Sequence, residues 1–437
     1  MKFRPEFSWE FLSADEIAHK SLRALRNHIK HIKEVSPYYR DLFSNISHED
    51  INTLDDFHQL PLTNKTTLSE NTAQFISVNS SQIVETVITS GSTGIPLVLP
   101  LTSNDLERIA FNEALSFHST GISDSDTAHI MVNLDRLYIA GMAYYRGLVL
   151  LGTNTMRTGV LPVEIQKYYL ETLPPSVIVA LPSHLRKLSQ ELAKLGFDSS
   201  KSSVNKVICI GESLKTPDMK PNATAKALQE FWGANLFSTY SSTELAVSFC
   251  ECTQSHGGHA HPELVYTEIV DEHGKPVPDG TPGELVATPL GVEGVPLVRY
   301  QTGDITYKIP GTCSCGRNSM RIGPILGRKA QLIKIQGTTI YPLTLTDALD
   351  ELDMIQDYLI ILENDSSLSD RVAIHVVSPP SSVEKIANHL RAVTKKNFPI
   401  LVSNMATLQS LRGSNRKRAR ILDWRKYSHT EQHKTQV

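Results

Sequence analysis

The chain has 437 residues, of which 40% are hydrophobic and 20% are charged, and its formal net charge is −3. This is the composition of a globular protein that is long enough for a large core and more than one domain. The basic residues are scattered, and no apolar run approaches the roughly 20 residues that span a membrane. We therefore expect a cytoplasmic protein that binds neither nucleic acid nor a membrane.

The first 60 residues are predicted to be mainly helical. A helix should begin after Ser13, because acidic residues follow this cap and apolar residues then recur at helical spacing. Beyond it, short apolar runs alternate with helical segments. Strands are expected over 83–89, 128–132, 176–180 and 204–210, and helices over 103–116, 139–151, 182–195 and 224–232. This alternation is typical of an α/β fold with a largely parallel sheet.

The pattern changes from about residue 267, where short runs separated by Gly, Pro and Asp predict an antiparallel β subdomain. A second break falls near Gly327 and Arg328. The segments beyond it are predicted to form strand, helix, strand, strand, helix and strand, the last over 401–408. Such a set makes a small α+β domain, so the expected domains are 1–327 and 328–437.

One loop, within TVITSGSTGIPLVLP at 86–100, concentrates Thr, Ser and Gly between two predicted strands. Such a loop can direct backbone amides and hydroxyls toward an anion. It lacks the lysine of a Walker A loop and the glycine spacing of a dinucleotide-binding turn. A tight hairpin remains the simpler alternative when the loop is considered alone.

Other stretches match a family pattern in the same order. They are YSSTE at 240–244, YQTGD at 300–304, CSCGRNSMRIGPILGR at 313–328 and RKRARILDW at 416–424. With the loop, they resemble the adenylate-forming superfamily of acyl-CoA synthetases and adenylation domains, and most of all its phenylacetate–CoA ligase branch. The resemblance covers almost the whole chain. It implies a large N-terminal domain of α/β subdomains with a small β-barrel-like subdomain, followed by a small mobile α+β domain.

The resemblance also implies an activity that depends on ATP and Mg²⁺. A carboxylic acid, expected to be aryl or arylacetic, becomes an acyl-adenylate and is then joined to CoA as a thioester. The partners would be the small-molecule acid, ATP and CoA, and two copies of the chain would pair as a homodimer. One alternative is a stand-alone adenylating enzyme that passes the acyl group to a carrier protein, an amine or another acceptor. A nucleotide-binding regulator without turnover is a further alternative.

By resemblance, three residues would be catalytic. Thr243 would bind the α-phosphate, Glu244 would ligate Mg²⁺, and Lys417 would supply positive charge to the acid and the α-phosphate. Glu244 is expected to open a helix that Ser241 caps. Asp304 would bind the ribose hydroxyls, and Arg328 would reach the ribose or the phosphates. The β- and γ-phosphates would be held by Thr89, Ser90, Gly91, Ser92, Thr93 and Gly94. The adenine would lie beside Tyr240, Gly211, Glu212 and Ser213, and the remaining contacts with ATP would come from Ser241 and Ser242.

Several of these assignments have ordinary structural alternatives. Asp304 could simply form a turn after Gly303, and the basic run around Lys417 could be a solvated surface. Two positions depart from the family pattern: Leu97 stands where many relatives have a lysine, and Ala330 stands where relatives often have an aspartate.

The acyl group is expected to bind near the apolar helix over 139–151 and the turn over 180–185. Small residues beside aromatic ones suit a compact acyl group, although a core helix would show the same pattern. The residues expected to line the pocket are Tyr138, Ala140, Gly141, Met142, Tyr145 and Ser183.

Five cysteines are too few for a disulfide framework in a chain of this length. Cys252, His259, Cys313 and Cys315 make a Cys₃His set, which suits a structural zinc ion. The resemblance favours His259 over His256 and His261 as the imidazole ligand. Buried free thiols are the alternative.

Overall fold

A computed structural model describes residues 8–89, 96–135, 137–335, 338–366, 369–413 and 419–425. The chain separates into two compact units. The first unit contains Met1–Leu214 and Thr224–Pro324, and the second contains Lys215–Ala223 and Ile325–Val437. The domain boundary expected between residues 327 and 328 stays a prediction, and the assignment of 215–223 to the second unit had no signal in the sequence.

The first 60 residues are mainly helical, as expected. The 3₁₀ turn η2 (Trp9–Phe11) precedes α1 (Ala14–Val35). Ser13 and Glu16 form a reciprocal capping box, with Ser13 N–H donating to Oε2 of Glu16 at 3.0 Å. The elements that follow are α2 (Pro37–Leu42), α3 (Leu54–His58), β1 (Thr63–Asn64), α4 (Lys65–Glu70) and α5 (Thr72–Phe75).

An eight-stranded sheet, in the order β14-β10-β9-β8-β7-β6-β4-β5, is the centre of the first unit. The strands from β5 to β8 are parallel, whereas β8, β9, β10 and β14 pair antiparallel. Their bounds are β4 (Thr127–Ile130), β5 (Asn154–Arg157), β6 (Val177–Ala180), β7 (Lys206–Ile210), β8 (Asn235–Ser242), β9 (Val247–Glu251), β10 (Gly258–His259) and β14 (Arg321–Ile322). The predicted α/β alternation is confirmed.

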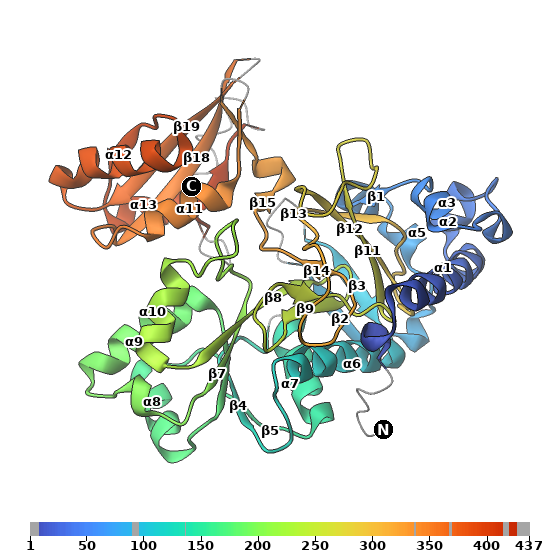
Figure 1. Cartoon of the computed structure of the whole chain (residues 1–437), viewed down its shortest axis with the longest axis horizontal. Helices are drawn as coiled ribbons and strands as arrows, with labels where there is room; N and C mark the ends of the chain where they lie inside the picture. The colour runs from blue at the N-terminus through green and yellow to red at the C-terminus, as the bar shows by residue number, and fades with distance from the viewer. Residues whose placement is uncertain are drawn as a thin grey trace. The chain divides into compact units, whose positions relative to one another are not determined.

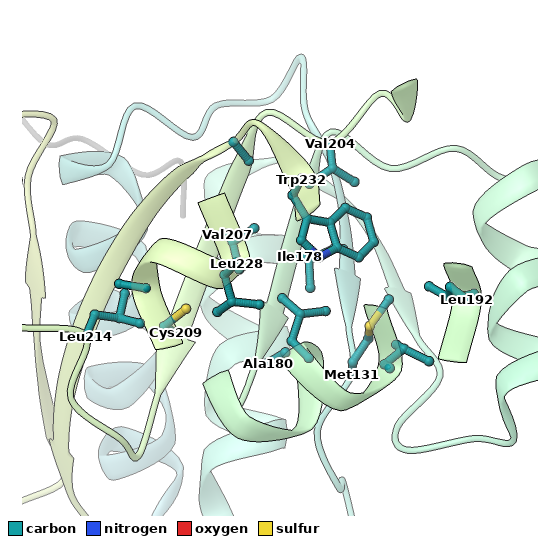
Figure 2. Packing of buried hydrophobic residues seen from close by; sticks show 14 of the residues in the cluster. Met131, Ile178, Ala180, Leu192, Val204, Val207, Cys209, Leu214, Leu228 and Trp232 are labelled. Atoms are coloured by element: carbon teal, nitrogen blue, oxygen red, sulfur yellow. The ribbon is translucent and has the colours of Figure 1, made fainter. Parts of the chain in front are cut away.

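Helices cover both faces of the parallel part of this sheet (Figure 1). On one side lie α8 (Val163–Thr172), α9 (Pro182–Lys194) and α10 (Ala223–Trp232), and on the other lie α6 (Ser103–Ser119) and α7 (Ile139–Leu151). Each face of the sheet carries a hydrophobic core, and alternate residues of β6 contribute to the two cores. Ile178 packs under α9 and α10, and Val179 packs under α6 and α7. Figure 2 shows the first core, in which Trp232 lies among Ile178, Val204 and Val207.

The segment with the Thr, Ser and Gly loop forms an antiparallel hairpin of β2 (Glu85–Ile88) and β3 (Val98–Leu101). The predicted antiparallel subdomain is also present. It is a sheet in which β1, β13 (Tyr300–Thr306), β12 (Gly283–Pro289) and β11 (Val265–Val270) are neighbours in this order. Its barrel-like closure stays a prediction.

The second unit has a sheet in the order β20-β19-β18-β21. Its elements are β15 (Gly327–Arg328), β16 (Ile333–Ile335), β17 (Thr338–Ile340), α11 (Pro342–Asp350), β18 (Asp357–Ser366), β19 (Ser369–Val377), α12 (Val383–Thr394), β20 (Ile400–Val402), α13 (Met405–Arg412) and β21 (Ile421–Asp423). The strand expected over 401–408 is present as β20 but is much shorter, because it ends at Val402 and α13 begins at Met405. Among the described residues of the whole chain, no helix is long and apolar enough to cross a membrane.

Candidate functional site

Glu244 lies in a tight turn between two antiparallel strands. Ser242 of β8 pairs with Val247 of β9, so only four residues remain for the connection. Ala246 N–H donates to the carbonyl of Thr243 at 3.2 Å, and Ala246 has a positive φ of 50°. The helix expected to begin at Glu244 with Ser241 as its cap is therefore wrong, since the strand pairing leaves no room for it.

The carboxylate of Glu244 is mostly buried, with 15% of its side chain exposed. Its Oε1 lies 3.3 Å from Nζ of Lys65, and Ser242 Oγ donates to its Oε2 at 3.3 Å. The same Nζ lies 3.4 Å from Oγ1 of Thr89. Lys65 thus joins the predicted magnesium ligand to the first residue of the predicted phosphate loop.

Strand pairing determines how Lys65 approaches Glu244 and Thr89. β1 runs parallel to β13, with Thr63 opposite Tyr300 and Asn64 opposite Gln301. Asn64 then caps α4, because its Oδ1 accepts from Thr67 N–H at 2.9 Å. This lysine was missed at the sequence level, since 179 residues separate it from Glu244 and no local motif relates the two.

Asp304, the predicted ribose ligand, lies further along β13 and is also held by β8. The hydroxyl of Tyr240 donates to Oδ2 of Asp304 at 2.9 Å. Asp304 is 6% exposed, and its N–H donates to Oγ1 of Thr302 at 3.1 Å. The structure therefore brings together Tyr240 and Asp304, two residues assigned to the nucleoside on separate motifs.

Thr89 closes the β2–β3 hairpin against Leu97. Two hydrogen bonds join these residues, each 3.0 Å long. Thr89 N–H donates to the Leu97 carbonyl, and Leu97 N–H donates to Oγ1 of Thr89. The Leu97 side chain is 3% exposed, so burial accounts for an apolar residue at this position. The other loop residues assigned to phosphate, Ser90, Gly91, Ser92, Thr93 and Gly94, lie outside the described residues.

Ser183 and Glu212 meet at the carboxyl edge of the parallel strands, where α/β sheets bind ligands. Ser183 is the second residue of α9, which follows β6, and Glu212 follows β7. Ser183 donates to Glu212 twice, from N–H to Oε2 at 2.9 Å and from Oγ to Oε1 at 2.6 Å. Gly211 makes the turn before Glu212 with a φ of 71°. The roles of these residues, and of Ser213, stay predictions.

Packing accounts for some of the residues in the helix that was expected to line the acyl pocket. A Cβ on Gly141 would lie 2.2 Å from the carbonyl oxygen of Asn133, so only glycine allows this approach. Ala140 belongs to the buried core beneath α6 and α7. The Tyr145 ring lies 4.4 Å from the Arg157 guanidinium. A pocket-lining role for these three residues, and for Tyr138 and Met142, stays a prediction.

The predicted metal ligands converge in the first unit. One ligand atom from each of Cys252, His259, Cys313 and Cys315 can be chosen so that all four lie within 4.8 Å of one another. Sγ of Cys252 lies 3.6 Å from Sγ of Cys313, and Sγ of Cys315 lies 3.6 Å from Nε2 of His259. Strand β10 brings them together, because it lies between β9, which precedes Cys252, and β14, which follows Cys315. Three thiols and one imidazole in this arrangement fit a tetrahedral zinc ion.

Neighbouring side chains orient the ligands of this cluster. Nδ1 of His259 lies 3.1 Å from Ser319 Oγ, which leaves Nε2 facing the cysteines. Arg317 donates to Sγ of Cys315 at 3.7 Å and to Oε2 of Glu10 at 3.1 Å. His261 is engaged elsewhere, with its ring nitrogens 3.1 Å from Glu10 Oε1 and 2.9 Å from Ser116 Oγ. This supports His259 over His261 as the ligand.

In the second unit, the predicted catalytic Lys417 lies outside the described residues. Arg420 of its motif and Arg425, directly after the motif, are held by several hydrogen bonds. Arg420 donates to Oδ2 of Asp350 at 2.6 Å and to the Tyr358 hydroxyl at 3.0 Å. Arg425 donates to Asp423 Oδ2 at 2.7 Å and to the Leu332 carbonyl at 2.8 Å. The segment that follows Lys417 is thus tied to the body of its own unit, which also contains Arg328.

Residues 14–292 match the AMP-binding enzyme family. Phenylacetate-coenzyme A ligase of Thermus thermophilus is 28% identical over 389 residues, which are 87% of this chain and 85% of that protein. The Pseudomonas putida enzyme of the same name is 28% identical over 376 residues, 84% of this chain and 83% of that protein. A 2-hydroxyisobutyryl-CoA ligase, solved in the postadenylation state in complex with R3-HIB-AMP, shares the fold with a TM-score of 0.84 at 20% identity and covers 98% of this chain and 94% of its own. The chain therefore belongs to the AMP-binding enzyme family, in its phenylacetate–coenzyme A ligase-like branch.

Proposed function

We propose that this protein is an AMP-forming ligase that joins a small carboxylic acid, aryl or arylacetic, to CoA. The observation that carries the proposal is the meeting of separate motifs in the first unit. Tyr240 contacts Asp304, and Lys65 contacts both Glu244 and Thr89. Four residues with expected roles toward one nucleotide are thereby brought into two groups: Tyr240 contacts Asp304 directly, and Lys65 bridges Glu244 and Thr89. The similarity to CoA ligases supports CoA as the acceptor.

In the first half-reaction, a carboxylate oxygen of the acid attacks the α-phosphorus of ATP. A phosphorus–oxygen bond forms, the bond from the α-phosphorus to the bridging oxygen breaks, and pyrophosphate leaves. Asp304 would accept hydrogen bonds from the ribose hydroxyls, oriented by its contact with the Tyr240 hydroxyl. Thr243 would donate to the α-phosphate, and Lys417 would stabilise the charge that develops there.

Glu244 is the carboxylate that would hold Mg²⁺, which when bound neutralises phosphate charge. A hard cation of this kind takes one or two protein carboxylates together with phosphate oxygens, and Glu244 fits that requirement. In the second half-reaction, the CoA thiolate attacks the acyl carbon, a thioester forms, and AMP leaves. The chemistry needs no protein nucleophile, so positioning and charge are the contributions that the enzyme must make.

A screen of pyrophosphate release over aryl, arylacetic, short hydroxylated and fatty acids, each with and without CoA, tests this function. We expect release to require a cognate acid and a CoA thioester to form only when CoA is present. Adenylate that accumulates without consuming CoA would instead favour transfer to a carrier protein or an amine. ATP binding without turnover on every acid would favour a nucleotide-binding regulator.

We also propose that the Cys₃His cluster holds a structural zinc ion. Zinc there would fix β9, β10 and the segment before β14 to one another. Because His259 is oriented by Ser319 and Cys315 by Arg317, the cluster has the outer hydrogen bonds that zinc sites use. The alternative, a set of free thiols, offers no reason for four donor atoms to converge.

Metal analysis of wild type and two cysteine variants tests the zinc proposal. We expect zinc in the purified wild type and its loss in Cys315→Ser, with a lower thermal midpoint. Cys209→Ser is the matched control, because Cys209 is buried in the core beneath α9 and α10, outside the cluster. Full zinc content in Cys315→Ser would contradict the proposed ligand set, and loss of adenylation on metal removal without loss of folding would contradict a structural role.

A cytoplasmic homodimer completes the proposal. None of the five cysteines, all of which lie among the described residues, forms a disulfide, which supports a reducing compartment. Pairing of two copies rests on the resemblance alone, and sedimentation analysis of the purified chain would measure it.

A further inference from the structure

We propose that Lys65 binds the β- and γ-phosphates of ATP, as a cation supplied from outside the phosphate loop. The inference rests on the proposed function and deepens it. Leu97, which follows Pro96 at the end of the loop, carries no charge and is buried in the hairpin. The loop therefore has no cation at that position. Lys65 supplies one from a different element, at the beginning of α4.

The contacts of Lys65 place its charge where MgATP would bind. Its Nζ lies 3.3 Å from Oε1 of Glu244 and 3.4 Å from Oγ1 of Thr89. Glu244 is the expected magnesium ligand, and Thr89 is the first residue of the expected phosphate loop. A group within reach of both would also be within reach of phosphate oxygens that bridge them.

The partial exposure of Lys65 and Glu244 favours a lysine that changes its partner when a ligand binds over one with a fixed structural role. The Lys65 side chain is 24% exposed and that of Glu244 is 15% exposed, so both remain accessible to a ligand. If Glu244 held Mg²⁺, its carboxylate would attract Lys65 less strongly, and the ammonium group would be available to a phosphate oxygen. Mg²⁺ leaves ATP with net negative charge, so a second cation there stabilises binding. A lysine is a compact, strongly hydrated charge that suits this contact.

The position of Lys65 in its helix also supports a contact with phosphate. A cation in the first turn of a helix interacts unfavourably with the helix dipole. Asn64 already caps α4, so Lys65 is not required to start the helix. The stability of α4 therefore does not explain why a lysine stands there, whereas its contact with Glu244 and the binding of an anion do.

Calorimetric binding of ATP and AMP to wild type, Lys65→Gln and Lys65→Arg tests the proposal. Charged hydrogen bonds are worth enough that losing one should weaken ATP binding about tenfold or more. AMP binding should stay within about twofold, because AMP has neither of the two phosphates. Lys65→Arg, which keeps the charge, should bind ATP more tightly than Lys65→Gln. The matched control is Lys206→Gln, since Lys206 is 20% exposed and its Nζ lies 3.2 Å from Asp126.

Kinetics give a second readout that a purely structural role would not produce. Lys65→Gln should raise KM for ATP and, in the reverse reaction, KM for pyrophosphate, while thioester formation from preformed acyl-adenylate stays within about twofold. Equal weakening of ATP and AMP, or an equal loss in both half-reactions, would overturn the proposal. Unchanged ATP binding in Lys65→Gln would also overturn it.

These outcomes separate this inference from the proposed function. If wild type shows no acid-dependent exchange of pyrophosphate into ATP, the proposed ligase activity fails. Selective weakening of ATP binding by Lys65→Gln would still support the phosphate contact in that case. If exchange is normal in Lys65→Gln and its ATP binding is unchanged, the ligase activity stands and the role of Lys65 is wrong. A folded Lys65→Arg protein keeps the test available should Lys65→Gln fail to fold.

Discussion

Glu113 carries a carboxyl group in the interior of the first unit, on α6. It is 4% exposed, and its Oε2 accepts from Ser248 Oγ at 2.9 Å. Burial raises the pKa of Glu113 from its usual 4.5 to about 7. The nearby groups that act on it are Ser248 and His261, both of which favour the charged form. Desolvation outweighs them, so the carboxyl is held partly neutral near neutral pH.

This residue predicts a pH dependence of stability. Below pH 4.5 the carboxyl is protonated in both the folded and the unfolded chain, and folding carries no penalty from it. As the pH rises toward about 7, only the unfolded chain ionises, so stability falls by up to about 3 kcal/mol and then levels off. Glu113→Gln, which cannot ionise, should therefore gain roughly 2 kcal/mol relative to wild type between pH 5 and pH 8. Urea denaturation at the two pH values measures this.

One control and one outcome decide that prediction. Glu107→Gln, on the exposed face of the same helix, controls for the loss of a helical carboxylate. If the difference between Glu113→Gln and wild type is the same at pH 5 and pH 8, the pKa of Glu113 is not raised and the prediction is wrong.

At the same scale, the sequence predicted residues whose chemistry is uncommon and missed those whose chemistry is ordinary. Three cysteines and a histidine are few enough that a shared site could be expected, and the fold brings them together. Lys65 is one of many basic residues in the chain, and only the pairing of β1 with β13 marks it out from the others. A contact across 179 residues has no local signature.

At the scale of elements, the helices and strands of the sheet were predictable because their periodicity is strong. The helix expected over 139–151 has the bounds of α7, Ile139–Leu151, and the buried strands β6 and β7 fall within their expected ranges. The predictions failed where a helix cap or a strand pairing determines where an element begins or ends. Asn404 Oδ1 accepts from Thr407 N–H at 2.8 Å and starts α13, which ends the expected strand.

The segment 215–223 shows a limit of another kind. It belongs to the second unit although the chain on both sides of it belongs to the first. Within that unit, Nδ2 of Asn222 donates to Oδ1 of Asp347 at 3.4 Å. Asp347 is itself buried, which raises its pKa to about 7. Nothing in the composition of 215–223 marks the segment as part of a second unit, because the association depends on a tertiary contact.

At the scale of the whole molecule, the residues assigned to the reaction are divided between the two units. The first unit holds Thr89, Thr243, Glu244 and Asp304, and the second holds Arg328 and Lys417. The two half-reactions need different charges at the α-phosphorus and at the acyl carbon. A chain divided in this way can therefore lose one half-reaction and keep the other.

We accordingly predict that Lys417→Ala abolishes adenylation and spares thioester formation. Lys417 would stabilise the charge that develops when the acid attacks the α-phosphate, and loss of such a donor costs about 100-fold or more in rate. The preformed acyl-adenylate has already passed that step, so its reaction with CoA should stay within about threefold of wild type. Pyrophosphate release and single-turnover thioester formation measure the two steps. Lys385→Ala, on the exposed face of α12, is the control in the same unit. Normal adenylation by Lys417→Ala would show that another group supplies the charge.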